Sequence, residues 1–339
     1  MRRTTALVGT AAGAATGAGL WLSRARADAA AVRADPVARS LTDPEVPGEQ
    51  RWVSSADGTR LNVALHGPKD APAVVLSHGW TCSTRYWNPQ VRDLADEYRV
   101  ITYDQRGHGV SANSRGRYGP DLLAEDLAAV LGATLEPEQQ AVLVGHSMGA
   151  MSIVAWAGRY PEQVARRASA ALLASTGVDG LLAESLVVRL PTRLPRLTEW
   201  IGRSALGMPT PLGRPSPLAF RAVKYVALSP GASPAQVAFC EEIVLGCRAR
   251  ARGKWGSALS RLDLRESLTH LRVPTTVLVG TADRLTPPGH PERLAEALDH
   301  DGHLDRLVEV DGVGHMSTVE DAPSVNAEIR RLLRSATAV

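Results

Sequence analysis

Residues 141–149 read Ala-Val-Leu-Val-Gly-His-Ser-Met-Gly, and they decide how the rest of the sequence is interpreted. The apolar run Ala141–Val144 predicts a short buried strand, and the residues from Met148 onward predict a helix. A serine between two glycines at such a junction is the G-x-S-x-G pattern of a nucleophile elbow. A strand that turns directly into a helix leaves little room for side chains. We therefore expect glycine at both flanking positions, Gly145 and Gly149.

This pattern predicts Ser147 as a nucleophile whose hydroxyl stands above the edge of the sheet. A serine hydroxyl becomes reactive only when a base takes its proton, so one of the nine histidines must lie beside it. His315 is the predicted base, because the glycine-rich run Gly312–His315 follows the last predicted strand. His146 is expected to point away from the nucleophile. The histidines with polar flanks are interpreted as solvated surface residues: His270, His290, His300 and His303.

Asp283 is predicted to orient the base, since a carboxylate is needed to hold the histidine tautomer and to stabilise the imidazolium. It comes directly after the apolar strand Thr275–Val279, which puts it at the same carboxyl edge of the sheet. Asp179 follows another predicted strand and is the alternative acid. The alternative role for Asp283 is a surface salt bridge with Arg284.

Two backbone N–H groups are expected to form an oxyanion hole. One belongs to Met148, the residue after the nucleophile. The other belongs to Trp80, in a loop that follows the apolar strand Ala73–Ser77. His78 and Gly79 support this loop, and a glycine here lets the backbone approach a substrate closely.

The stretch 104–111 reads Asp-Gln-Arg-Gly-His-Gly-Val-Ser. Its glycines and mixed charges predict a turn that braces neighbouring loops by internal hydrogen bonds. A direct role for His108 or Ser111 at the substrate is the alternative.

Apolar strands alternate with helices along most of the chain, which predicts a parallel sheet covered on both faces. Asp57-Gly58 predicts a hairpin turn near the start of this sheet. The alternation breaks after residue 177, where a Pro- and Leu-rich segment is expected to form a helical cap over the carboxyl edge. The predicted units are a signal-like or membrane-anchor segment (1–27), a linker (28–48), the first part of the core (49–177), the cap (178–260) and the second part of the core (261–339).

The first 27 residues contain the parts of an export signal or a membrane anchor. Arg2 and Arg3 precede the uncharged run Ala6–Leu22, and Ala25–Ala27 resembles a small-residue cleavage site. We therefore expect an exported or membrane-associated protein. A cytoplasmic protein with an Ala-rich tail is the alternative.

Composition is that of a globular protein, with 44% apolar and 22% charged residues, and the net charge of +3 gives no indication of nucleic-acid binding. Three cysteines cannot form a disulfide framework, and Cys240 and Cys247 are too far apart along a helix to bond. Between residues 178 and 257, eleven Arg and Lys outnumber five Asp and Glu. A basic, leucine-rich cap favours anionic lipid or a lipid-like acyl substrate. The alternative is a solvated insertion in an arginine-rich chain.

Taken together, these elements resemble the α/β-hydrolase superfamily from about Arg51 to the C-terminus, apart from the cap. The resemblance implies an eight-stranded, mostly parallel sheet with helices on both faces, no cofactor, and a cap that shapes the substrate pocket. Ser147 argues against the epoxide hydrolases and haloalkane dehalogenases of this fold, which carry an aspartate at the elbow. The matching elements, in family order, are His78-Gly79-Trp80, 104–111, Gly145–Gly149, Asp283 and His315.

The expected activity is hydrolysis of carboxylic esters, lipid-like acyl esters included, through an acyl-enzyme on Ser147. Thioesterase, lactonase, carbon–carbon bond hydrolase and cofactor-free perhydrolase reactions use the same residues, so they stay open. A ligand receptor with weak hydrolysis is the alternative from a different class. The expected partner is a small acyl ester, and the sequence leaves the oligomeric state open.

Overall fold

The structure is a computed structural model that describes residues 23–42, 44–181, 185 and 208–337. An eight-stranded sheet in the order β1-β2-β4-β3-β5-β6-β7-β8 forms its centre. β2 pairs antiparallel with β1 and β4, and every other pairing is parallel, which confirms the predicted sheet. The strands are β1 (Gly48–Ser54), β2 (Arg60–His66), β3 (Ala73–Ser77), β4 (Arg99–Tyr103), β5 (Ala141–His146), β6 (Ala168–Ala174), β7 (Thr275–Gly280) and β8 (Leu304–Val310).

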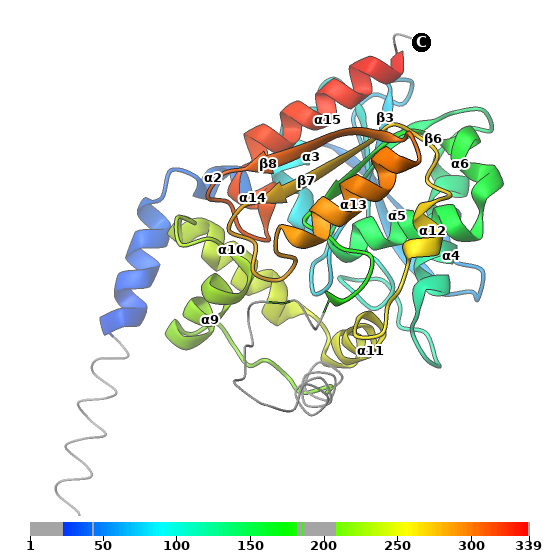
Figure 1. The fold of residues 1–339 in the computed structure, drawn as a ribbon. Coiled ribbons are helices and arrows are strands. Elements are labelled where there is room, and N and C mark those ends of the chain that lie inside the picture. Colours follow the sequence, from blue (N-terminus) through cyan, green and yellow to red (C-terminus); the bar gives the residue numbers. More distant parts are fainter. Residues whose placement is uncertain (1–22, 43, 182–184, 186–207, 338–339) are drawn as a thin grey trace, which may run out of the picture.

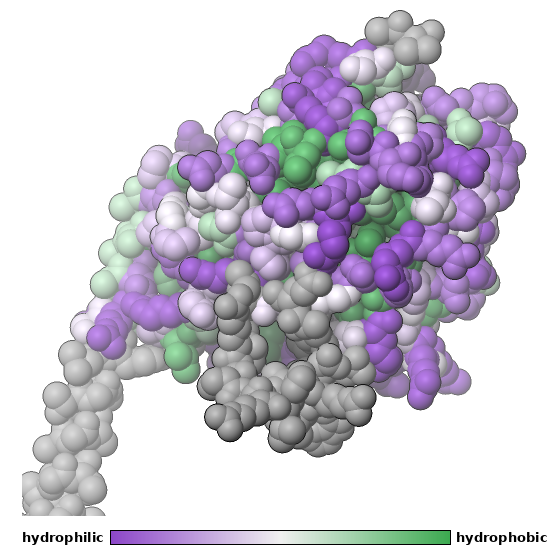
Figure 2. Space-filling view, viewed as in Figure 1, coloured by the Kyte–Doolittle hydropathy of each residue, from purple (hydrophilic) through white to green (hydrophobic). Residues whose placement is uncertain are grey.

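The central strands β3, β5 and β7 are buried along their whole length, and mostly apolar, because both faces of the sheet are covered. In β3, Val75 packs into the core on one face, while Val74 and Leu76 pack into the core on the other. β8 lies at the edge, and its side chains are largely exposed. Figure 2 shows hydrophobic surface in the region that β8 and its neighbours occupy in Figure 1, and Leu307 of β8 is one of the exposed apolar residues there.

Helices cover the two faces of the sheet in separate layers (Figure 1). α4, α5 and α13 pack on one face, whereas α3 and α15 pack on the other. The helices that the sequence predicts near 87–98, 121–135, 148–160 and 325–333 correspond to α3, α4, α5 and α15. The helices of the core are η1 (Thr84–Trp87), α3 (Asn88–Leu94), α4 (Pro120–Thr134), α5 (Met148–Arg159), α6 (Pro161–Arg167), α12 (Arg265–Leu268), α13 (Gly289–His300), α14 (Ser317–Glu320) and α15 (Ala322–Thr337).

Three helices of the predicted cap are described: α9 (Pro217–Ala227), α10 (Pro234–Gly246) and α11 (Ala249–Leu259). Residues 182–184 and 186–207 of the predicted cap lie outside the described residues. α11 rests on the loop after β4, where Trp255 Nε1 donates to the carbonyl oxygen of Arg106 at 3.0 Å. The described part of the cap is therefore fixed to the carboxyl edge of the sheet.

The chain before β1 differs from the prediction. Residues 23–34 form a helix and α2 (Ala38–Leu41) follows it, so the predicted linker 28–48 is corrected to a largely helical arm. The stretch lacks apolar periodicity, but alanine is its commonest residue, and alanine has the highest helix propensity. Within the described ranges, no helix is both long and apolar enough to cross a membrane. Most of the predicted signal or anchor, residues 1–22, lies outside them.

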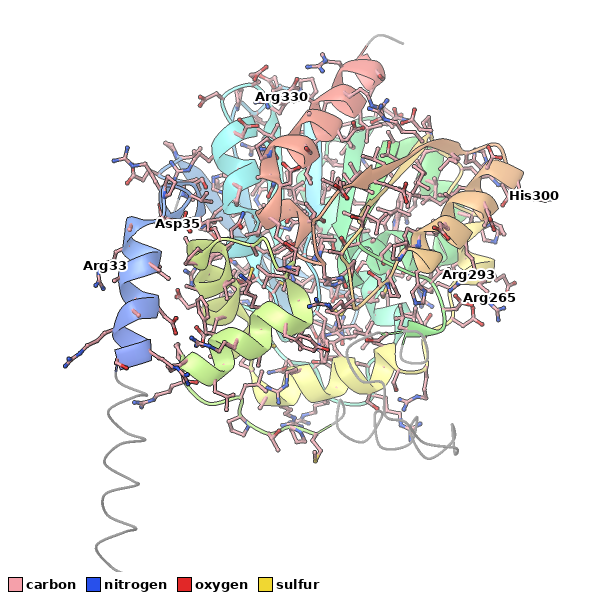
Figure 3. All side chains as sticks on the ribbon, turned by 60° about the vertical axis from the view of Figure 1, so that its left-hand side comes forward. Arg33, Asp35, Arg265, Arg293, His300 and Arg330 are labelled. Atoms are coloured by element: carbon pink, nitrogen blue, oxygen red, sulfur yellow. The ribbon has the colours of Figure 1, made fainter. Side chains whose placement is uncertain are left out.

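This N-terminal arm, residues 23–42, packs against the cap. Asp28 forms an ion pair with Arg221 of α9 at 3.0 Å, and Asp35 Oδ2 accepts a hydrogen bond from the backbone of Ala235 in α10 at 2.8 Å. In Figure 3 Arg33 points away from the molecule, whereas Asp35 lies beside α10. Leu41, at the end of the arm, is buried in the core, and Val37 and Ala38 pack beside it, so the arm is held by apolar as well as polar contacts. Its outer surface in Figure 2 is mixed in hydropathy.

Candidate active site

The turn between β5 and α5 has the geometry that the sequence predicts for a nucleophile elbow. Ser147 has φ 51° and ψ −117°, a left-handed conformation that a residue with a side chain adopts only under strain. Its N–H donates to the carbonyl oxygen of Ala174 at 2.9 Å, and its own carbonyl accepts from Thr176 Oγ1 at 3.0 Å. These bonds hold the half-buried serine directly at the N-terminus of α5.

Both glycines of the elbow are required by close backbone contacts. A Cβ on Gly149 would lie 1.9 Å from the carbonyl oxygen of Ser77 in β3, and one on Gly145 would lie 2.4 Å from the backbone of Ala150. The predicted oxyanion loop also touches the elbow, since a Cβ on Gly79 would lie 3.3 Å from Ser147 Cβ. The predicted loop and the predicted nucleophile are thus side by side.

His315 and Asp283 form a buried pair at the same sheet edge. The Nδ1 atom of His315 lies 2.9 Å from Oδ2 of Asp283. Thr286 completes the carboxylate's surroundings, with its Oγ1 at 2.8 Å from Oδ2 and its N–H at 3.0 Å from Oδ1. Because an ionised carboxylate only accepts, Nδ1 carries the proton and Nε2 keeps a free lone pair.

The electrostatics of Asp283 suit a permanently ionised group. Burial alone raises the pKa of a carboxyl, but the neighbouring His315 and the hydrogen bonds from Thr286 outweigh burial and hold the pKa of Asp283 below its usual value. The alternative acid, Asp179, instead faces Arg265 and Arg293 at 3.7 and 3.9 Å. Figure 3 shows these two arginines next to each other.

The alternative reading of Asp283 as a surface ion pair does not describe its contacts. Arg284 donates to the carbonyl oxygen of Tyr225 at 2.8 Å and lies over the Tyr225 ring. Among the described residues, no hydrogen bond joins Ser147 Oγ to His315. Such contacts are often long until a substrate binds. The serine and the histidine thus lie on neighbouring loops, without a hydrogen bond between their side chains.

His146 has a structural role that its position in the sequence did not reveal. Its Nε2 lies 2.8 Å from the carbonyl oxygen of His315. Complete burial and the adjacent His315 lower the pKa of His146 to about 3, so the ring is neutral and Nε2 is the donor. His146 thereby anchors the backbone of the residue predicted as the base.

The predicted oxyanion loop is braced by two buried histidines. His78 Nε2 accepts the backbone N–H of Gln105 at 3.1 Å, and His108 Nε2 accepts that of Thr81 at 3.2 Å. Burial lowers the pKa of both histidines, which fits neutral acceptors. Trp80, whose N–H is the predicted donor, is half-buried, and its ring nitrogen donates to a backbone carbonyl of α11 at 3.1 Å.

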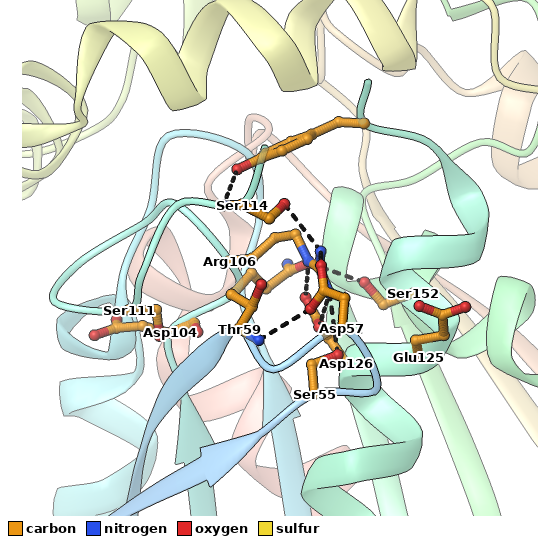
Figure 4. Close-up of polar contacts among 12 residues, drawn as sticks. Ser55, Asp57, Thr59, Asp104, Arg106, Ser111, Ser114, Glu125, Asp126 and Ser152 are labelled. Atoms are coloured by element: carbon orange, nitrogen blue, oxygen red, sulfur yellow. Dashed lines mark hydrogen bonds and ion pairs between the residues drawn. The ribbon is translucent and has the colours of Figure 1, made fainter. Parts of the chain in front are cut away.

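The stretch 104–111 is braced internally, as predicted. The carboxylate of Asp104 accepts the backbone N–H of Val110 at 3.0 Å, and Ser111 Oγ donates to the Asp104 carbonyl at 2.6 Å. Figure 4 shows Arg106, which is fully buried and forms ion pairs with Asp126 at 2.5 Å and Asp57 at 2.8 Å. This ion-pair network fixes the loop on which α11 of the cap rests.

One surface prediction needs correction. His290 is only 2% exposed, because it lies in the first turn of α13 and packs against Gly177, where an added Cβ would be 2.7 Å from its Nδ1. The polar sequence around it concealed this packing. In the part of the chain that the structure describes, no three His, Cys, Asp or Glu side chains gather in a way that would hold a metal ion.

An eight-stranded, mostly parallel sheet with helices on both faces is the architecture of the α/β hydrolases. A model of the alpha/beta hydrolase family matches residues 74–328. The chain therefore belongs to the alpha/beta hydrolase family.

Similar proteins agree with this membership. A bifunctional esterase/perhydrolase of Acinetobacter calcoaceticus is 28% identical over 84% of this chain and 99% of its own. A 3-oxoadipate enol-lactonase of Acinetobacter baylyi is 26% identical over 83% of this chain and 95% of its own. Among solved structures, an esterase from Thermogutta terrifontis has a TM-score of 0.67 at 23% identity, covering 85% of this chain and 99% of that one.

Proposed function

We propose that this hydrolase cleaves carboxylic esters of modest size through an acyl-enzyme on Ser147. The observation that carries the proposal is the buried His315–Asp283 hydrogen bond of 2.9 Å, beside an elbow that strains the backbone of Ser147 to φ 51°. Strain of this kind is kept where function needs it. The curated relatives, an esterase/perhydrolase and an enol-lactonase, support an ester-like substrate.

In this mechanism, the free lone pair on His315 Nε2 takes the hydroxyl proton of Ser147 as its oxygen attacks the ester carbonyl. Asp283 stabilises the resulting imidazolium through Nδ1. The imidazolium then gives the proton to the departing alcohol, leaving an acyl group on Ser147. Water, deprotonated by the same Nε2, attacks the acyl-enzyme and releases the carboxylic acid.

The tetrahedral intermediates carry a negative oxygen, which we propose is held by the backbone N–H groups of Met148 and Trp80. Met148 begins α5, so its N–H is one of those that no helical carbonyl accepts. The approach of Gly79 to Ser147 supports a contribution from the second loop. Losing one such donor costs about 10²–10³ in rate in other hydrolases.

Two measurements test this proposal. A series of p-nitrophenyl esters of increasing acyl length should be hydrolysed by the wild-type chain and not by Ser147→Ala. A fluorophosphonate should label the wild-type chain only. A chain that turns over no ester and takes no label is a ligand receptor instead, and equal turnover by Ser147→Ala would refute the mechanism. The length at which turnover peaks reports whether lipid-like acyl chains are preferred.

Perhydrolysis is the second activity that a specific observation favours, because the Acinetobacter calcoaceticus relative is described as both esterase and perhydrolase. In that reaction hydrogen peroxide replaces water in attacking the acyl-enzyme and releases a peracid. Peracid formation from acetate and hydrogen peroxide, compared with ester hydrolysis on the same preparation, measures the ratio of the two activities. Thioesterase and carbon–carbon hydrolase activities have no such observation behind them.

We also propose that the segment before the N-terminal arm directs export or membrane association. The support is the sequence of Ala6–Leu22, a 17-residue run without charge behind a pair of arginines. Cell fractionation, with the N-terminal residue of the mature chain read by mass spectrometry, tests this. Recovery of the full-length chain in the soluble cytoplasm would refute it.

A further inference from the structure

The loop that carries His315 lies directly against the cap, at the turn after α9. Met316 N–H donates to the carbonyl oxygen of Ala227, the last residue of α9, at 3.1 Å. A Cβ on Gly314 would lie 2.5 Å from the backbone nitrogen of Ser229. Gly314 and Met316 flank the histidine, so the cap backbone touches the chain on both sides of the proposed base.

Two side chains extend this contact. Glu320, at the end of α14, accepts the backbone N–H of Ser229 with Oε2 at 2.8 Å. Gln236, in the first turn of α10, donates from Nε2 to the carbonyl oxygens of Val319 and Glu320 at 2.9 and 3.0 Å. Gln236 is 7% exposed, and burial raises the pKa of the Glu320 carboxyl. The bond from Gln236 to Val319 is buried and the other two are partly buried, and low exposure to water strengthens such bonds.

The loop needs such support because it contains little regular secondary structure. Between β8 and α15 the only regular element among the described residues is α14, a single helical turn of four residues. One turn is not stable by itself, since nucleating a helix costs more than its first hydrogen bond returns. The position of His315 is thus set by tertiary contacts, with His146 on the β5 side and the cap on the other.

We propose that Glu320 and Gln236 are positioning residues that clamp the His315 loop to the cap. The position of the α9–α10 turn then determines the position of the base. The inference rests on the proposed function. It makes the cap part of the catalytic geometry as well as a cover for the substrate. A change in the position of the cap then alters kcat, because misplacing a catalytic group by about 1 Å lowers the rate on the order of 10²-fold.

The test compares Glu320→Ala, Glu320→Gln and Gln236→Leu with the wild-type chain on a short p-nitrophenyl ester. Glu320→Ala removes the acceptor for the Ser229 N–H, and kcat should fall about 10–100-fold with little change in KM. Glu320→Gln keeps an acceptor oxygen of the same reach, so kcat should stay within about fivefold of wild type. Gln236→Leu, of similar volume, loses both donated bonds and also the oxygen that accepts the Ser233 N–H at the start of α10, and its kcat should resemble that of Glu320→Ala.

Glu241→Ala is the matched control. Glu241 is 5% exposed and accepts the backbone N–H of Ser216 at 3.0 Å, so it makes the same kind of bond as Glu320, but within the cap and away from the base. Its loss should lower the melting temperature without lowering kcat. Equal kcat losses in Glu241→Ala and Glu320→Ala would overturn the inference, as would an unchanged kcat in Glu320→Ala.

The conservative variant separates position from charge. If Glu320→Gln loses as much kcat as Glu320→Ala, the negative charge matters rather than the clamp, and the inference fails. Should Glu320→Ala not fold, Gln236→Leu and Glu320→Gln decide the matter by the same comparison. A wild-type chain without ester turnover or fluorophosphonate labelling would refute the proposed function itself. An active wild type whose Glu320 and Gln236 variants keep the wild-type kcat would refute only the inference about the clamp.

Discussion

His146 should make the folded protein less stable at acidic pH, and the substitution His146→Gln should remove this contribution. Burial of the ring and the adjacent His315 lower the pKa of His146 from 6.5 to about 3. His146→Gln keeps an amide nitrogen that can reach the carbonyl oxygen of His315, as Nε2 does at 2.8 Å, but it cannot be protonated.

The sign and size of the effect follow from proton linkage. Between pH 6.5 and pH 3 the unfolded chain binds a proton at His146 that the folded chain does not, so the free energy of unfolding falls as the pH falls. At pH 7.5 this contribution is negligible. At pH 5 it amounts to about 2 kcal/mol of lost stability, taking a pKa of 6.5 in the unfolded chain and about 3 in the folded one.

Urea denaturation at pH 7.5 and pH 5.0 measures this difference. Other buried histidines contribute to both proteins equally, so the relevant quantity is the wild-type stability minus that of His146→Gln. This difference should shift by about 2 kcal/mol in favour of the variant on going to pH 5.0. If the two proteins lose the same stability, His146 is not a buried neutral donor and the account of how the His315 loop is anchored is wrong.

Three further substitutions, one of them with a matched control, test the site and its strain. Asp283→Asn should lower kcat on the order of 10⁴-fold in the ester assay, because Nδ1 of His315 loses the acceptor that fixes its tautomer; a loss under tenfold would contradict this. Ser147→Gly should abolish turnover yet raise the free energy of unfolding by about 1 kcal/mol, since glycine relieves the strain at φ 51°; lower stability would argue against strain. Gly149→Ala should destabilise by about 3 kcal/mol in thermal or urea unfolding, because its Cβ meets backbone 1.9 Å away, whereas Gly132→Ala in α4 meets nothing within 4 Å and should stabilise slightly. Equal effects of the two alanines would contradict that.

The sequence sufficed for the strands and for the residues that end them. β3 has the bounds that its apolar run Ala73–Ser77 predicts, because a strand buried on both faces needs continuous apolar residues. Parallel strands bring their carboxyl ends to one edge, and this alone predicts that residues after β5, β7 and β8 meet. Ser147, Asp283 and His315 do lie on those loops, and the last two are hydrogen-bonded. Their catalytic roles remain predictions for the assays above.

What the sequence did not predict depends on contacts between distant segments. Nothing near residue 229 indicates that its N–H meets Glu320, and nothing near Arg106 indicates that Asp126 will neutralise it inside the core. The arm before β1 was missed for a related reason. Most of it has no apolar stripe, since an ion pair and a backbone hydrogen bond hold residues 28–35 to the cap, and apolar packing is confined to Val37, Ala38 and Leu41.

These missed contacts share one arrangement around the site. The residues that the motifs reveal are fixed by local backbone demands, such as the two glycines of the elbow, and so they leave a local signature. The residues that hold them in register are His146, Glu320 and Gln236. Their hydrogen bonds go to backbone atoms, of the His315 loop and α14 for His146 and Gln236 and of the cap for Glu320, and a backbone partner puts no constraint on the sequence at the other end. Many of the contacts that position the proposed base therefore leave no recognisable pattern in the sequence. It also lies partly in the cap, which means that changes in the cap that alter substrate choice should alter the geometry of the base as well.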